Sequence, residues 1–214
     1  MPSRGYDVQI PPAVPFASAL VFLPHRYHAQ MTMREGNPWR RLSRRVAYEN
    51  PWIEVLHDEV LRPDGEPGIY GVVHFRHRAI GVVPMVGDRV LLVGQYRYAP
   101  DRYSWEVPEG GGDFDEEPEV AARRELAEET GYTGGEWREL YRADLSNSVT
   151  DEAAVMFVAT GLVPGPAAPE GTEELVTRWV DFEEALAMIA TGDIRDAMSI
   201  LGLQALALER AALR

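Results

Sequence analysis

Three glutamates at helical spacing are the residues of this chain best suited to chemistry. Glu125, Glu128 and Glu129 stand at positions i, i+3 and i+4, so on a helix they share one face. Like charges at this spacing repel each other, and divalent cations with oxygen ligands are the obvious means of offsetting the repulsion. The spacing therefore predicts a Mg2+ site, with Mn2+ as a substitute cation. The alternative is a solvated acidic helix.

These glutamates need a helix that begins and ends at defined residues. Pro118 suits the first turn, where its missing N–H would have no partner in any case, and Gly131 is a natural stop just past the last turn. The two signals predict a helix over residues 118–130. Three glycines at 110–112 precede it and let the backbone turn tightly and approach a ligand closely.

The whole segment 110–132 follows the pattern G-x5-E-x7-R-E-L-x-E-E-x-G, and this pattern closely resembles the signature box of the Nudix hydrolases. The resemblance implies a set of metal ligands: Glu125 and Glu129, then Glu128, and the carbonyl of Glu109. It also implies a structural role for four residues of the pattern: Gly110, Glu116, Arg124 and Gly131. Among these, Glu116 and Arg124 are expected to pair and to hold the glycine loop onto the helix.

Composition narrows the class of protein. The chain has 214 residues and no cysteine, which excludes disulfides and thiolate metal sites. Its net charge of −13 argues against nonspecific nucleic-acid binding. No apolar run approaches the length of a membrane span. All 21 basic residues are arginines, so a P-loop lysine or a Schiff base is excluded. We expect a cytoplasmic enzyme without nucleic-acid or membrane partners.

The pattern of apolar residues divides the chain into three parts. Residues 1–30 carry five prolines and are expected to form a flexible tail; their short apolar run makes only a poor secretory signal. Residues 31–78 are expected to form an N-terminal β region, and residues 79–214 a Nudix hydrolase domain. Expected strands lie at 46–50, 52–56, 60–62, 69–75, 79–86, 90–96, 137–144, 153–160 and 175–180. Further helices are expected from a capping box at 181–184 to 190, and over 196–212.

This order of elements is α/β and is similar to a Nudix α/β/α sandwich with a mixed sheet, preceded by a small antiparallel β region. Three segments resemble the ADP-ribose pyrophosphatase branch, namely 48–52 with 62–65, 92–98, and 105–110. In that branch the N-terminal sheet exchanges between two subunits, so the resemblance implies a homodimer. It also implies a nucleotide-sugar substrate, with ADP-ribose hydrolysed to AMP and ribose 5-phosphate.

The same resemblance suggests substrate contacts outside the box. Arg97 corresponds to an arginine that contacts the diphosphate, a role that suits its planar, bidentate fork. Glu106 stands where relatives have a carboxylate near the substrate. Tyr70 and Trp52 are candidates for stacking on the base. The alternatives are a surface arginine at position 97 and core aromatic residues at positions 52 and 70.

A loop after the box carries the expected general base. Relatives have a catalytic glutamate aligned with Glu152 that activates the attacking water, with Asp151 as the alternative; Glu128 and Glu129 are expected to share in catalysis. ADP-ribose enzymes typically have a proline where this chain has Asn147. The substrate could therefore instead be GDP-mannose, NADH or a dinucleoside polyphosphate. A non-catalytic nucleotide-sugar sensor is a further alternative, although the box is complete.

Overall fold

The computed structural model describes residues 36–168 and 174–212. The chain divides into two units, and the second, Pro38–Arg214, holds every helix and strand described below. The tail predicted at residues 1–30 lies outside the described residues. None of the described helices is long and apolar enough to cross a membrane.

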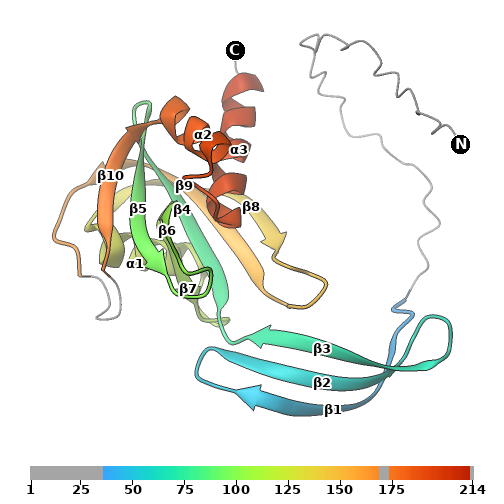
Figure 1. The fold of residues 1–214 in the computed structure, drawn as a ribbon. Helices are drawn as coiled ribbons and strands as arrows, with labels where there is room; N and C mark the ends of the chain where they lie inside the picture. Colours follow the sequence, from blue (N-terminus) through green and yellow to red (C-terminus); the bar gives the residue numbers. More distant parts are fainter. Residues whose placement is uncertain (1–35, 169–173, 213–214) are drawn as a thin grey trace, which may run out of the picture. The chain divides into compact units, whose positions relative to one another are not determined.

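The second unit opens with a three-stranded antiparallel sheet (Figure 1). Its strands are β1 (Arg40–Glu49), β2 (Ile53–Leu61) and β3 (Pro67–Phe75). The sequence predicted a break between two strands at positions 57–59, and this is wrong because β2 is continuous there. The polar Asp58 stays inside the strand because Arg44, its register partner on β1, binds both of its oxygens at 2.7 Å. The hydrogen bonds from Arg44 lower the pKa of Asp58 despite its burial.

A seven-stranded mixed sheet follows, and it confirms the predicted fold class. Its strands are β4 (Arg78–Val86), β5 (Arg89–Arg97), β6 (Arg102–Glu106), β7 (Glu109–Gly112), β8 (Thr133–Asp144), β9 (Ala153–Val163) and β10 (Val176–Asp181). The main order is β10-β5-β4-β9-β8, with β6 paired to β5 and β7 paired to β4. The pair β4–β9 is parallel and the other pairs are antiparallel.

Helices cover both faces of this sheet (Figure 1): α1 (Pro118–Thr130) lies on one face, and α2 (Phe182–Thr191) with α3 (Ala197–Ala212) lies on the other. The central strands β4 and β9 contribute side chains to the hydrophobic cores on both faces of the sheet, because successive side chains of a strand point to opposite faces. Ile80 and Val82 of β4 pack with Leu126 of α1. Val83 and Met85 join the core around Leu203 of α3. The α1 layer is thereby fixed against the sheet by buried apolar side chains.

The structure differs from the predicted elements in three places. Strands β6 and β7 were not predicted; β7 is Glu109 followed by three glycines, and such a segment becomes a strand only by pairing with β4. The capping box expected at Asp181 does not form, because its side chain makes no hydrogen bond to the helix. The start of α2 is instead fixed by the backbone N–H of Phe182, which donates to the carbonyl of Asp88 at 2.8 Å.

Candidate active site

The helix that carries the acidic residues has the predicted bounds, Pro118 to Thr130. It ends at Gly131, whose left-handed conformation (φ 76°) turns its N–H back to the carbonyl of Ala127. A side chain at this position would be strained. The apolar face of α1, with Leu126 at its centre, is buried against the sheet. Glu129 is also buried, with 3% of its surface exposed, because the adjacent strand β7 covers it.

Strand β7 lies directly on the acidic residues of α1. The backbone N–H of Glu109 donates to Oε2 of Glu129 at 3.2 Å. A Cβ atom on Gly110 would overlap the carboxyl group of Glu125. A side chain at position 110 would therefore displace this carboxylate or the strand. The close approach to a ligand that the glycine run predicted stays a prediction.

Arg124 holds the loop and the helix together. Its guanidinium donates to the carbonyl of Gly111 at 2.8 Å and to Glu116 at 3.2 Å. It also donates to Glu125 at 2.6 Å and to Glu128 at 3.2 Å. Burial works against the charged guanidinium, but the hydrogen bonds to Glu116 and Glu125 outweigh it and raise the pKa of Arg124. The geometry thus contains the Glu116–Arg124 pair that the sequence pattern suggested.

A second arginine lies at the other end of the glycine strand. Arg97, at the end of β5, donates to the buried Glu106 and to Oε1 of Glu109, the latter at 2.7 Å. Burial disfavours its charge, but the two carboxylates more than compensate and raise the pKa of Arg97. The pKa of Glu109 is itself raised well above its usual range, first by burial and then by the neighbouring charges of Asp196 and Glu106.

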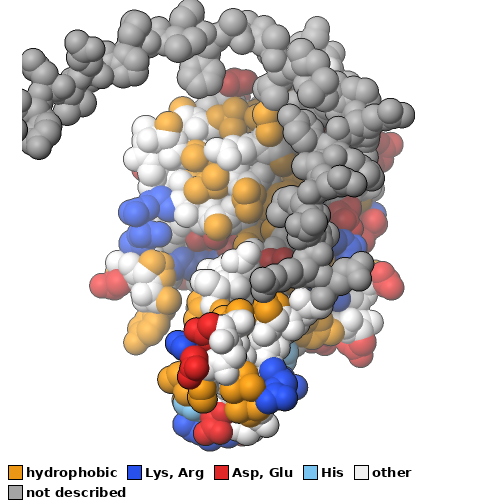
Figure 2. Space-filling view, turned by 90° about the vertical axis from the view of Figure 1, so that its right-hand side faces the viewer, with side chains coloured by type: hydrophobic (Ala, Val, Ile, Leu, Met, Phe, Trp, Pro, Cys, Tyr) orange, Lys and Arg blue, Asp and Glu red, His pale blue; other side chains and the backbone are white. Residues whose placement is uncertain are grey.

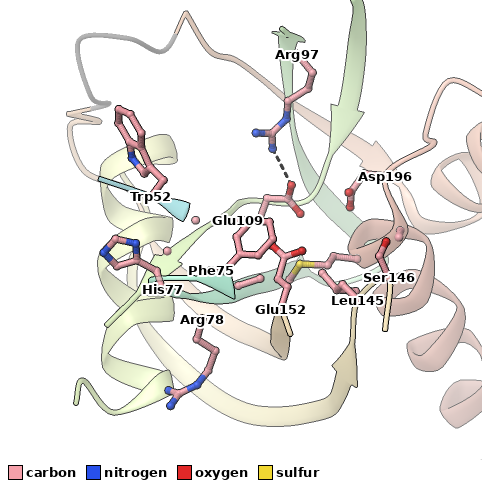
Figure 3. A pocket seen from close by; sticks show the side chains of 15 residues that line it. Trp52, Phe75, His77, Arg78, Arg97, Glu109, Leu145, Ser146, Glu152 and Asp196 are labelled. Carbon is pink, nitrogen blue, oxygen red and sulfur yellow. Dashed lines mark hydrogen bonds and ion pairs between the residues drawn. The ribbon is translucent and has the colours of Figure 1, made fainter. Parts of the chain in front are cut away.

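Arg97 and Glu109 border a cavity of about 610 Å³ (Figure 3). The cavity is lined by Trp52, Phe75, His77, Arg78, Ala79, Arg97, Glu109, Gly110, Gly111, Leu145, Ser146, Glu152, Asp196, Ala197 and Met198. Three carboxylates therefore meet at this cavity from three separate segments: Glu109 from β7, Glu152 from the loop before β9, and Asp196 from the start of α3. Glycines 110 and 111 form part of the wall, where Gly110 faces Glu125 of α1 and Gly111 faces His77.

The two loop carboxylates have different surroundings. Glu152 lines the cavity, and burial together with the charge of Asp196 raises its pKa. Asp151 is turned toward β3, where it lies 2.6 Å from Nδ1 of His74 and accepts a hydrogen bond from the backbone N–H of Phe75 at 3.2 Å. The geometry thus favours Glu152 over Asp151 as the base, although the assignment stays a prediction.

Asp196 is a cavity residue that the sequence analysis missed. Its Oδ2 accepts a hydrogen bond from the backbone N–H of Ser199 at 2.6 Å, so it caps the N-terminus of α3. A capping aspartate looks ordinary in a sequence, and nothing in its local pattern indicates that it borders a site. His77 and Arg78 also border the cavity and were missed. His77 lies in the short link between β3 and β4 and Arg78 is the first residue of β4, and nothing in their local sequence indicates a site.

The two aromatic candidates lie differently. Trp52 is 67% exposed and borders the cavity, where an aromatic face would be open to a ligand. Tyr70 is not among the residues that border it. Its hydroxyl donates to the carbonyl of Ser148 at 2.7 Å, and its ring packs edge to face against Trp39. The stacking role of either residue stays a prediction.

The donors around α1 have the chemistry of a divalent-cation site. Carboxylate and carbonyl oxygens are the ligands that Mg2+ prefers. Oε2 of Glu109 is buried without a hydrogen-bond partner, which a cation would satisfy. Within residues 36–168 and 174–212, no group of three or more His, Asp or Glu is already gathered around one point. One reason is that Glu125 and Glu128 both accept hydrogen bonds from Arg124, which holds their carboxylates toward the guanidinium.

Comparison with known proteins agrees with this geometry. The NUDIX domain family matches residues 75–199, and the nucleoside diphosphate sugar hydrolase N-terminal domain matches residues 39–73. A CMP-5'-(N-acetyl-N-hydroxy-3-aminopropyl)phosphonate hydrolase of Streptomyces rubellomurinus is 32% identical, over 78% of this chain and 81% of its own. An ADP-ribose pyrophosphatase of Mycobacterium tuberculosis is 33% identical, over 69% and 73% respectively.

A solved structure, that of an ADP compounds hydrolase, has the same fold. It superposes with a TM-score of 0.75 over 82% of this chain and 95% of the other, at 19% identity. The predicted resemblance to the Nudix enzymes and to ADP-ribose pyrophosphatases is thereby confirmed. The chain belongs to the Nudix hydrolase family and carries the N-terminal domain of the nucleoside diphosphate sugar hydrolases.

Proposed function

We propose that the chain is a Mg2+-dependent pyrophosphatase that hydrolyses ADP-ribose to AMP and ribose 5-phosphate. The observation that carries the proposal is the cavity of about 610 Å³, which brings Glu109, Glu152 and Arg97 together beside the acidic face of α1. Pockets for small molecules and cofactors commonly have volumes of this order. The Mycobacterium tuberculosis relative, which is named ADP-ribose pyrophosphatase, supports the choice of substrate.

The metal would be held by the box carboxylates Glu125, Glu128 and Glu129 together with Glu109. When bound, Mg2+ neutralises the diphosphate and lowers the pKa of a coordinated water. Arg97 contributes a guanidinium at the cavity wall that can donate to a phosphate in addition to its bonds to Glu106 and Glu109. Trp52 offers an exposed aromatic face on which the base can stack.

Glu152 is the general base in this proposal. It lines the cavity and accepts a proton from the water whose oxygen attacks one phosphorus of the substrate. The P–O–P bridge then breaks, and the bridging oxygen leaves with the other phosphate. The raised pKa of Glu152 suits this role, because a base with a pKa nearer neutrality accepts a proton more readily.

We propose that the active protein is a homodimer formed through the three-stranded sheet. This sheet carries four large hydrophobic side chains at its surface, Leu42, Val46, Tyr48 and Ile69, and the partly exposed Trp39 lies just before its first strand. Figure 2 shows such side chains in orange among charged ones. A sheet that leaves so many apolar side chains in water is a natural contact surface for a second copy.

A substrate panel tests the proposal. The purified protein with Mg2+ is offered ADP-ribose, GDP-mannose, NADH, a dinucleoside polyphosphate and a CMP-linked phosphonate, and the products are separated by ion exchange. We expect ADP-ribose to be cleaved with the highest kcat/KM, giving AMP and ribose 5-phosphate. Equal or faster cleavage of another member would overturn the choice of substrate, and no cleavage of any member would overturn the activity.

The CMP-linked phosphonate is the second candidate. The Streptomyces relative that covers 78% of this chain is named for such a substrate. In addition, Asn147 stands where ADP-ribose enzymes typically have proline, in the loop that ends at Glu152. A preference for the CMP-linked compound would identify this loop as the first place to look for the determinant of specificity.

A further inference from the structure

The loop that carries Glu152 is attached to the N-terminal sheet by its backbone. The N–H of Val73 on β3 donates to the carbonyl of Val149 at 2.8 Å, and the N–H of Asp151 donates to the carbonyl of Val73 at 3.3 Å. Val73 and Thr150 thus form a parallel bridge outside the named strands. For a few residues the loop behaves as a further strand of the three-stranded sheet.

One pair of side chains reinforces this attachment next to Glu152. Nδ1 of His74 lies 2.6 Å from Oδ2 of Asp151, and a carboxylate can only accept, so Nδ1 is the donor. The other oxygen, Oδ1, accepts from the backbone N–H of Phe75 at 3.2 Å. Both oxygens of Asp151 are therefore held by two consecutive residues at the end of β3, which leaves its side chain little freedom.

Fixing Asp151 also fixes Glu152, because consecutive Cα atoms are separated by about 3.8 Å and cannot move independently. On the other side, the carbonyl of Glu152 accepts from the N–H of Leu145 at 2.8 Å, closing the base of the loop. Ser146 within the loop has a left-handed backbone (φ 45°), which is unfavourable for a residue other than glycine. The loop therefore depends on its surroundings to keep this conformation.

We infer that His74 is a positioning residue of the hydrolytic reaction, which holds Asp151 so that Glu152 is presented to the cavity. The inference rests on the proposed role of Glu152 as base. His74 does not line the cavity, so it acts through the loop and not through contact with the substrate. The His74–Asp151 pair is partly exposed, with 38% and 48% of the two side chains accessible. Exposed ion pairs contribute little to the free energy of unfolding, so losing this pair should affect the position of the loop and not the stability of the whole protein.

The test is a double-mutant cycle between His74 and Glu152, measured with ADP-ribose and Mg2+. His74→Ala should lower kcat by roughly 2- to 5-fold, the scale of one exposed pair, with KM changed less than about twofold and Tm unchanged. His74→Asn should recover most of kcat, since Nδ2 of asparagine replaces Nδ1 of histidine at the same distance from the backbone. In the Glu152→Gln background, His74→Ala should have no further effect on kcat.

Each alternative has its own outcome. If the losses from His74→Ala and Glu152→Gln multiply in the double variant, His74 does not act through Glu152 and the inference is wrong. If His74→Ala lowers Tm and His74→Asn restores only Tm, the residue is merely structural. If Glu152→Gln alone keeps full kcat, the proposed base is wrong instead. Glu209→Gln, which removes a similarly exposed ion pair with Arg138, serves as the control and should change none of these values.

Discussion

Arg97 links two largely buried carboxylates, Glu106 and Glu109, at the edge of the cavity. The side chain of Arg97 is 36% exposed, whereas that of its partner Glu106 is only 3% exposed. A buried carboxylate that loses its partner is costly, so Arg97 has a structural role in addition to the proposed contact with phosphate. The two roles can be separated by mutation.

Arg97→Ala should raise KM for ADP-ribose by about tenfold or more, because one charge-assisted phosphate contact is lost. It should also lower Tm, because Glu106 is left buried without its cation. The double variant Arg97→Ala/Glu106→Gln should recover much of Tm but keep the high KM. Melting curves and steady-state kinetics on both proteins decide the matter, and an unchanged KM would remove Arg97 from the substrate site.

The raised pKa of Glu152 predicts how activity depends on pH. A general base works only when deprotonated, so kcat should fall as the pH drops through this pKa, above the usual value of about 4.3 for glutamate. Asp196→Asn removes a like charge and should move the acid limb of the profile to lower pH. Asparagine still caps α3. An identical acid limb in Glu152→Gln would contradict the assignment.

At the scale of elements, the contact between β7 and α1 brings the glycine loop onto the acidic helix. Gly110→Ala would place a methyl group on the carboxyl group of Glu125, so either the strand or the carboxylate must shift. We expect a loss of about tenfold or more in kcat, since small displacements of a catalytic group have effects of this size. Gly71→Ala on β3 is the matched control, because its methyl group would meet no atom within 4 Å. Equal activity of the two variants would contradict this account.

The same elements show what the sequence could and could not predict. Both ends of α1 were predicted because Pro118 and Gly131 act locally. Strand β7 was not, since a run of glycines has no strand preference and pairs only because β4 lies beside it. The box carboxylates follow from spacing within one helix. Asp196 could not be predicted, because only the packing of α3 brings it to the cavity.

At the scale of the whole molecule, the exposed apolar side chains of the three-stranded sheet predict self-association. Light scattering after gel filtration should give twice the chain mass of 23.9 kDa. Val46→Arg on β1 should shift the protein toward the monomer, because a charge replaces an apolar side chain that is 48% exposed in the single chain. A monomeric wild-type protein with full activity would show that the sheet does not serve as a dimer contact.

The most direct measurement of the central claim is the release of AMP from ADP-ribose by the wild-type protein and by Glu129→Gln. The wild-type protein should release AMP with Mg2+, stop on addition of EDTA and resume when Mg2+ is restored. Glu129→Gln keeps the size of this buried side chain and an acceptor for the N–H of Glu109, so it should fold normally. Its kcat should nevertheless fall by about two to four powers of ten.

Glu119→Gln, which breaks only a surface pair with Arg123 on the same helix, should retain full activity. Wild-type turnover by Glu129→Gln, or AMP release that EDTA does not stop, would contradict a metal-dependent reaction at the acidic face of α1.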